Sequence, residues 1–392
     1  MIHKPKSKAS GKTISSGHSG WIPVFRPSIT QAEIDAVAEV MRSGWLGLGA
    51  VTERFEKALA EYFGAAHVVC LNSGTAALHL ALRLLDLQPD DEVIVPAITF
   101  VSTAHAVGYS GARPVFADVE KDTLCLSVDD VRRKITPRTR AIIPVHYGGH
   151  PCDLDGLREA IAGRNITMIE DAAHACGAVY HGRMIGGLSP LTSFSFHAVK
   201  NLTCGEGGAI LTNEPAWDKQ LRELRWLGIS KDTYTRSVHA RVYAWQYQVN
   251  KLGYKCHMHD ISAAIGLVQL RRLEENNRKR RTVVERYNAA FRPHGWIETP
   301  PELEGMRSSW HIYHIKVPRR DRLIAHLKRR GIAPGVHYYP LHLHPYYAKQ
   351  RAECPVAEEI WKRVLSLPLF PDLTGEEITR VIEAVLSFGE TL

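Results

Sequence analysis

Short apolar runs alternate with helical patterns along the first half of the chain. Continuous apolar runs of strand length lie at 67–72, 92–98, 113–119, 140–147 and 167–173. Helical patterns lie between them, at 75–87, at 101–111, from Ser127 and from Asp153. Strands that are apolar on both faces and alternate with helices form mostly parallel sheets covered on both sides. The pattern therefore predicts an α/β domain around a mostly parallel sheet.

Two amphipathic helices precede this region, and their ends carry sequence signals. The first opens at Thr30, which has Glu33 three residues later as in a capping box, and it runs out at Gly44. The second follows with the sequence TERFEKALAEYF and reaches Gly64. Glycine commonly ends helices, so both helices are predicted to stop at these glycines.

The pattern changes after Asn213. A helix is predicted at 214–228, and a polar and aromatic stretch leads from there to a long helix at 260–291. The remainder mixes a strand at 308–317 with helices at 320–331 and 375–388. Such a mixture is typical of a smaller α+β domain.

The chain has 392 residues, of which 45% are apolar, enough for one large domain and a smaller one. Its basic start, rich in Ser and Gly, is interpreted as a flexible tail. We predict a tail at 1–20, a large α/β domain at 21–265 and a small C-terminal α+β domain at 266–392.

The charge balance admits nucleic acid as a partner, because the formal charge is +8 and the pI about 9.1. One basic cluster, 271–281, is interpreted as a solvated helix face. No zinc-finger spacing or aromatic RNA-binding motif accompanies the charge, so no nucleic-acid partner is predicted. His342 and His344 lack a nearby carboxylate or cysteine pattern, and no metal site is predicted.

The cysteines and the apolar runs bear on the compartment. Seven cysteines are scattered without a CxxC pair, and no export signal opens the chain. The longest apolar runs have the length of strands, far below that of a membrane span. These features predict a cytoplasmic protein with reduced thiols and no membrane partner.

The first candidate binding loop joins a strand to a helix through Ser73, Gly74 and Thr75. Ligands bind at the carboxyl ends of strands in an open parallel sheet. Gly74 would let the backbone approach an anion, and the N–H groups of Thr75 and Ala76 would point at it from the positive end of the helix. The alternative is an ordinary N-cap.

Two further loops carry charged groups. Glu170 and Asp171 follow an apolar strand directly, although a carboxylate there is often only a cap or a salt-bridge partner. Lys200, with Ser195 shortly before it, lies between two apolar runs that are typical of buried strands. A lone amine at such a point needs a bonding partner.

One chemistry uses a lysine, a carboxylate and an anion-binding helix end together. A lysine amine can hold an aldehyde cofactor as an imine while a carboxylate pairs with a protonated pyridine nitrogen. A charge pair about 4 Å apart at an effective dielectric near 20 is worth roughly 4 kcal/mol, or about three pKa units. Phe100, at the end of a predicted strand, would cover one face of the ring; the alternative is a core position.

Several segments resemble the DegT/DnrJ/EryC1/StrS aminotransferases. They are SGWLGLG, NSGTAALHLAL, DEVIVPAITFVSTAHA, EDAAHACGA, FSFHAVKNLTCGEGGAI and DISAAIGLVQL, and the resemblance extends from about Trp21 to the C-terminus. It implies fold type I, that of pyridoxal-phosphate enzymes similar to aspartate aminotransferase. It also implies a homodimer with shared active sites.

The resemblance assigns roles to residues of this chain. Lys200 would bind the cofactor aldehyde and move the proton, Asp171 would pair with the pyridine nitrogen, and Phe100 would stack on the ring. His174 would contact the phenolic oxygen. The phosphate contacts would be Ser195, Gly74, Thr75, Ala76 and, from the second subunit, His257, where relatives often have Asn.

The resemblance also implies a reaction. The enzyme would transfer an amino group from an amino acid, with glutamate expected, to the keto group, with C4 expected, of a nucleotide-linked keto sugar. Alternatives are a C3 aminotransferase, a sugar dehydratase, or a non-catalytic regulatory protein that binds the cofactor. Lys200 argues against the dehydratases, which carry His at this position. Substrate contacts are expected from His337, Lys251, Lys255 and Arg241.

Overall fold

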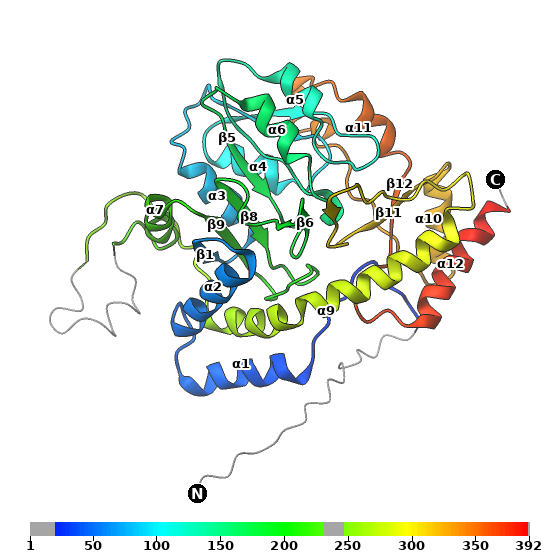
Figure 1. Cartoon of the computed structure of the whole chain (residues 1–392), viewed down its shortest axis with the longest axis horizontal. Coiled ribbons are helices and arrows are strands. Elements are labelled where there is room, and N and C mark those ends of the chain that lie inside the picture. Colours follow the sequence, from blue (N-terminus) through cyan, green and yellow to red (C-terminus); the bar gives the residue numbers. More distant parts are fainter. Residues whose placement is uncertain (1–19, 231–246, 391–392) are drawn as a thin grey trace, which may run out of the picture.

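A computed structural model describes residues 20–230 and 247–390 and is built around a seven-stranded sheet (Figure 1). The strand order is β1-β9-β8-β5-β4-β2-β3, and β9 alone runs antiparallel to its neighbours. The strands are β1 (His67–Leu71), β2 (Glu92–Pro96), β3 (Arg113–Ala117), β4 (Thr139–Ile142), β5 (Thr167–Asp171), β8 (Leu191–Ser195) and β9 (Gly208–Thr212). The predicted mostly parallel α/β sheet is confirmed.

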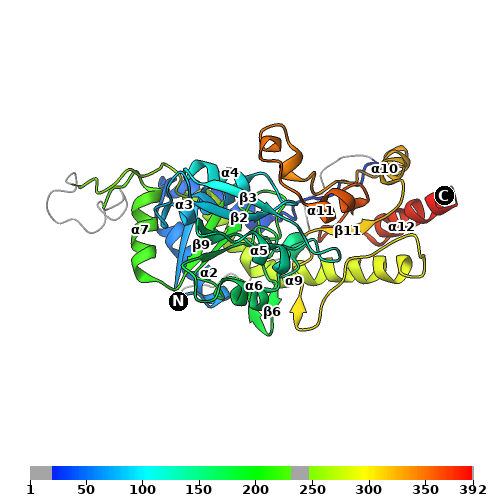
Figure 2. The same cartoon turned by 90° about the horizontal axis from the view of Figure 1, so that it is seen from above.

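Helices cover both faces of the sheet. Figure 2 shows α3 and α4 above it and α2, α6 and α9 below it. The helices of this part are α1 (Gln31–Ser43), α2 (Ala50–Phe63), α3 (Gly74–Arg83), α4 (Ser102–Tyr109), α5 (Val128–Lys134), α6 (Leu154–Ile161) and α7 (Pro215–Arg225). The capping box of α1 forms as predicted, and Gly44 and Gly64 end their helices with φ of 74° and 66°.

The C-terminal part begins in α9 (Asp260–Phe291), the longest helix of the described chain. It continues with an antiparallel strand pair and the helices that pack beside it. These elements are β11 (Tyr313–Lys316), α10 (Arg320–Arg329), α11 (Pro355–Ile360), β12 (Val364–Leu367) and α12 (Gly375–Gly389). A further small antiparallel sheet joins β6 (Val179–Tyr180), β7 (Arg183–Met184) and β10 (Met306–Arg307). The sequence patterns predicted β11, α10 and α12 but missed the shorter elements.

Two hydrophobic cores divide the described chain. The first surrounds the large sheet and receives α9 as far as Leu273, whereas the second receives α9 from Val283 onward. The packing therefore changes inside one continuous helix. The boundary predicted between residues 265 and 266 falls within that helix and stays a prediction. Of the predicted tail at 1–20, residues 1–19 lie outside the described residues.

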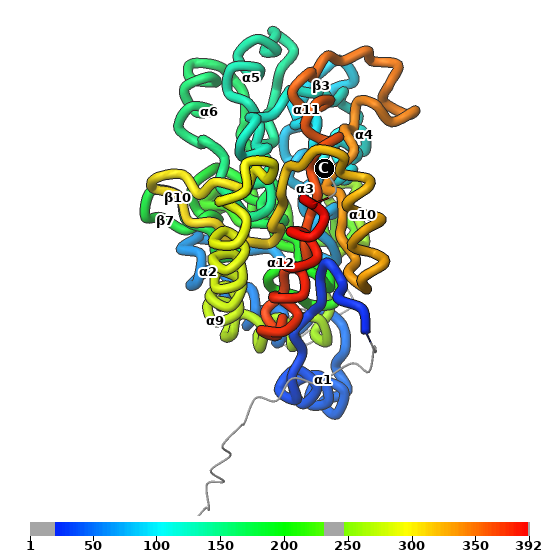
Figure 3. Tube along the Cα trace, turned by 90° about the vertical axis from the view of Figure 1, so that its right-hand side faces the viewer, coloured from blue at the N-terminus to red at the C-terminus, as the bar shows by residue number. Residues whose placement is uncertain are grey.

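The first described residues pack on the C-terminal part of the chain. Ile22 pairs with Ile332 as in a parallel strand, and Arg380 donates a hydrogen bond to the Gly20 carbonyl at 3.1 Å. Figure 3 shows this segment running beside α10 and α12. The contact matters for function because the same segment carries Phe25 to the cavity described below.

All seven cysteines lie in described segments and are free thiols, six of them buried. Within 20–230 and 247–390, no helix combines the length and the apolar character needed to cross a bilayer.

Candidate active site

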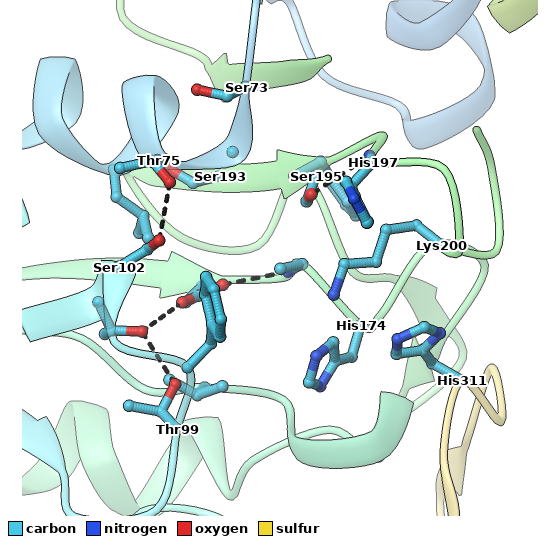
Figure 4. A pocket seen from close by; sticks show the side chains of 18 of the residues that line it. Ser73, Thr75, Thr99, Ser102, His174, Ser193, Ser195, His197, Lys200 and His311 are labelled. Carbon is cyan, nitrogen blue, oxygen red and sulfur yellow. Dashed lines mark hydrogen bonds between the residues drawn. The ribbon is translucent and has the colours of Figure 1, made fainter. Parts of the chain in front are cut away.

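The loops that follow β1, β5 and β8 meet at one end of the sheet and line a cavity of about 400 Å³. Figure 4 shows hydroxyl side chains on one side of this cavity and Lys200, His174 and His311 on the other. The parallel strands explain the meeting, because their carboxyl ends share one edge of the sheet. Among the predicted site residues, the lining includes Gly74, Thr75, Phe100, Asp171, His174, Ser195, Lys200 and His337.

The hydroxyl side of the cavity lies at the N-terminus of α3. A methyl group on Gly74 would lie 2.8 Å from the Cβ of Ser195, so only glycine lets the helix start approach the end of β8 this closely. The hydroxyls of Thr75 and Ser102 are 2.7 Å apart. Hydroxyl groups and the first N–H groups of a helix suit a phosphate.

The Ala76 amide does not fit its predicted role as a phosphate donor. Its N–H donates to the Ser73 hydroxyl at 3.1 Å, and Ala76 is not part of the cavity lining. Ser73 is the N-cap of α3, and its hydroxyl therefore already accepts the hydrogen bond that the Ala76 N–H can donate. The Gly74 and Thr75 amides remain, and neither donates to any residue in the described part of the chain.

The adjacent carboxylates of β5 have separate surroundings. Asp171 faces the cavity and accepts hydrogen bonds from the Thr103 hydroxyl at 2.8 Å and the Ala173 N–H at 3.2 Å. Glu170 points the other way and pairs with the His146 ring at 2.7 Å. Burial raises the pKa of Asp171, an effect that these two hydrogen bonds and Lys200 oppose. Asp171 is therefore the carboxylate at the cavity, as predicted.

The Lys200 side chain ends in the cavity without a partner. No residue in the described segments accepts a hydrogen bond from its Nζ or forms an ion pair with it. Burial lowers the pKa of Lys200 to about 8, against the opposing charge of Asp171. Near pH 7.4 about a fifth of this amine is thus neutral, far more than for an ordinary lysine, and the neutral form is the one that a nucleophile or a general base requires.

His174 is held as a neutral hydrogen-bond donor. Burial and the neighbouring cations hold its pKa well below the usual range. Its Nδ1 accepts the Gly148 N–H at 3.3 Å, so the ring proton of the neutral form sits on Nε2. That Nε2 lies 3.3 Å from the Tyr338 hydroxyl. The predicted role of His174 as a donor to a ring oxygen agrees with this arrangement.

Phe100 and His337 also lie at the cavity. The Phe100 side chain is 57% exposed, which rules out the alternative that it is a core residue. The Nδ1 of His337 forms a hydrogen bond with the Ser366 hydroxyl at 2.8 Å. Burial and the charge of Lys200 lower the pKa of His337 to about 4. A large exposed aromatic side chain at a cavity mouth can cover a flat ligand.

Other predicted contacts do not meet in this cavity. His257 packs edge-to-face on Trp226 at 4.3 Å, and Lys251 lies 3.7 Å from the Glu223 carboxylate. Lys255 lies over the Trp226 ring, 3.3 Å from its centroid. None of the three lines the cavity of its own chain, and Arg241 lies outside the described residues. Their predicted roles thus require a second subunit and stay predictions.

Sequence patterns missed several lining residues. They are Phe25, Ser102, Thr103, His311 and Tyr338. His311 was interpreted only as part of the strand predicted at 308–317. A polar residue in an otherwise apolar run was the available signal for it.

Residues 27–386 match the family described as DegT/DnrJ/EryC1/StrS aminotransferase. The chain belongs to this family. It is 40% identical over 376 residues to the spore coat polysaccharide biosynthesis protein SpsC of Bacillus subtilis, covering 93% of this chain and 96% of that protein. The PLP form of Spr1654 from Streptococcus pneumoniae superimposes with a TM-score of 0.88 at 35% identity, covering 95% and 99% of the two chains. PseC of Helicobacter pylori, an aminotransferase of pseudoaminic acid biosynthesis, superimposes with a TM-score of 0.89 at 27% identity, covering 95% of this chain and 100% of PseC.

Membership makes this protein a sugar aminotransferase of fold type I that uses pyridoxal phosphate. The residues present fit this cofactor. Lys200 offers a partnerless amine, Asp171 a buried carboxylate, and the close approach at Gly74 an anion cradle. When bound, the cofactor supplies an electron sink for the carbon that gains or loses the amino group.

Proposed function

We propose that the protein transfers the amino group of glutamate to the C4 keto group of a nucleotide-linked keto sugar. The position of Lys200 carries the proposal. Its amine is buried and partnerless, and its pKa of about 8 suits repeated proton uptake and release. The roles of SpsC and PseC in polysaccharide and pseudoaminic acid biosynthesis support a sugar as the acceptor.

We assign a role to each side chain from its position in the cavity. Lys200 moves one proton in each half-reaction, taking it from one reacting carbon and delivering it to the other. Asp171 keeps its negative charge where a protonated ring nitrogen would lie, and Thr103 holds it in place. His174 directs its Nε2–H into the cavity. The hydroxyls of Thr75 and Ser195, with the N-terminus of α3, bind phosphate.

The nucleotide and the second subunit belong to the same proposal. Lys200 is the one lysine or arginine among the described residues that line the cavity. A phosphate, a dicarboxylate donor and a pyrophosphate together bring several negative charges. We assign the balancing cations to Lys251, Lys255 and Arg241 of a second copy, with His257 as its phosphate contact. The protein would thus act as a homodimer in the cytoplasm.

Amination at C3 remains the alternative within the same chemistry. A dehydratase or a regulatory protein without turnover fits less well, because the amine, the carboxylate and the anion cradle are all in place.

The test is incubation of the purified enzyme with glutamate and a set of nucleotide-linked keto sugars, followed by mass spectrometry. We expect one amino sugar product, and NMR of that product should place nitrogen at C4. Nitrogen at C3 would establish the alternative. No aminated product from any nucleotide-linked sugar, with amination of free sugars instead, would refute the proposed substrate class.

A further inference from the structure

His311 is a buried histidine at the cavity that the roles above do not use. Its side chain is 2% exposed and lines the cavity beside His174 and Lys200 (Figure 4). Neither ring nitrogen has a hydrogen-bond partner among the described residues, and Nδ1 is also shut off from solvent. Nε2 also lacks a partner but is not shut off from solvent, so it is the ring nitrogen that a ligand in the cavity can reach. The ring therefore has unused hydrogen-bonding capacity at the reaction centre.

The His311 ring is fixed in place by its neighbours. It stacks on Phe25, with ring centroids 5.0 Å apart and planes 9° from parallel. It also contacts the ring of His174, with centroids 4.6 Å apart. The backbone N–H of His311 donates to the Gly148 carbonyl at 2.8 Å, and the backbone N–H of Gly148 donates to the ring of His174. One residue thus aligns both histidines, and a ring held by two ring neighbours is positioned for a directed contact.

The charge state of His311 limits what it can contact. Burial and the charge of Lys200 hold its pKa well below the usual range, so the ring is neutral. A neutral imidazole can donate to a carboxylate and equally to a hydroxyl. An arginine in the same place would be left as an unpaired buried charge whenever a hydroxyl replaced a carboxylate. Both substrates of a transaminase occupy one cavity in turn, which makes a neutral donor suitable.

We propose that His311 contacts both substrates, donating through Nε2 to the donor's α-carboxylate in the first half-reaction and to a sugar hydroxyl beside the keto carbon in the second. This inference rests on the proposed function. Phe25 acts as a positioning residue, because its stacking fixes the ring that makes the contact. Phe25 comes from the N-terminal segment, and so that segment contributes to substrate recognition.

The test uses His311→Phe, which keeps the stacked ring and removes the donor, and His311→Gln, which keeps a donor. His314→Phe is the matched control: His314 lies nearby in the chain and is equally buried but does not line the cavity. Stopped-flow absorbance of the cofactor-loaded enzymes would follow each half-reaction separately, first with glutamate and then with the keto sugar. Each is measured over a range of substrate concentrations to obtain the maximal rate and the half-saturating concentration.

We expect His311→Phe to bind the cofactor normally and to lose about ten- to hundredfold in efficiency in both half-reactions. His311→Gln should recover part of the loss, and His314→Phe should match the wild type. A loss in one half-reaction alone, or in neither, would overturn the shared contact. A wild-type enzyme that reacts with glutamate but with no nucleotide-linked keto sugar would instead refute the proposed function, and the shared contact with it.

Discussion

The buried amine of Lys200 should weaken the fold of the protein when no cofactor is bound. Its pKa falls from an ordinary value of 10.5 to about 8, because burial disfavours the charged form. Folding at neutral pH therefore moves the ammonium charge of Lys200 out of water, which lowers the free energy of unfolding. Replacing Lys200 with methionine, an apolar side chain of similar length, removes that cost.

The magnitude and its pH dependence follow from the shift. Each pKa unit corresponds to about 1.4 kcal/mol, so the fall from 10.5 to about 8 costs at most about 3.5 kcal/mol. Below pH 8 the amine is protonated in both folded and unfolded states, and the full cost applies. Between pH 8 and 10.5 the unfolded chain holds a proton that the folded protein has released, so the stability of the wild type rises with pH. Above pH 10.5 the cost is gone.

The assay is urea denaturation of the cofactor-free proteins at equal concentration, followed by circular dichroism at pH 7 and at pH 10. We expect Lys200→Met to be more stable than the wild type at pH 7 by up to about 3.5 kcal/mol, and the difference to shrink strongly at pH 10. Lys57→Met, a change at an exposed lysine, should do little at either pH. Equal or lower stability of Lys200→Met at pH 7, or a gain that does not depend on pH, would refute the reasoning.

Three further substitutions test the other side of the cavity. Asp171→Asn should retain the cofactor but lower kcat by about a hundredfold or more, because an amide cannot hold the ring nitrogen protonated; a near-normal kcat would show that another carboxylate acts. Thr103→Val removes the hydroxyl donor to Asp171 and should lower kcat about tenfold while the pH titration of the bound-cofactor absorbance shifts; an unchanged titration would contradict a positioning role. Gly74→Ala places a methyl group 2.8 Å from the Cβ of Ser195 and should weaken cofactor binding at least about tenfold, as measured by equilibrium dialysis. The control Gly108→Ala, whose methyl group meets open space, should bind the cofactor like the wild type. Equal affinities of the two variants would exclude the close approach as the basis of the phosphate site.

The fold could be predicted from local patterns because its main elements are locally encoded. The capping box at Thr30 and the glycine at position 64 each mark a helix end within a few residues of sequence, and both hold in the structure. The short strand β12 and the helix α11 were missed. They have few residues over which a periodic pattern can show.

The candidate site could be predicted only in part. Asp171 is the last residue of β5 and Lys200 lies shortly after the end of β8, so the parallel pairing of these two strands brings them together. The contact of Phe25 with His311 joins segments almost 290 positions apart, and no local pattern predicts such a pairing. Local patterns alone left both Glu170 and Asp171 as candidates; the family resemblance named Asp171, and the structure directs Asp171 to the cavity and Glu170 to His146. The role of the Ala76 amide depended on the cap that Ser73 forms.

The central claim is that the Lys200 amine is the group to which the cofactor aldehyde bonds. The most direct measurement is reduction of the cofactor-loaded enzyme with borohydride, followed by proteolysis and mass spectrometry of the peptides. The account predicts one phosphopyridoxyl adduct, on the peptide that contains Lys200. An adduct on a different lysine, or none on an enzyme that contains the cofactor, would contradict it.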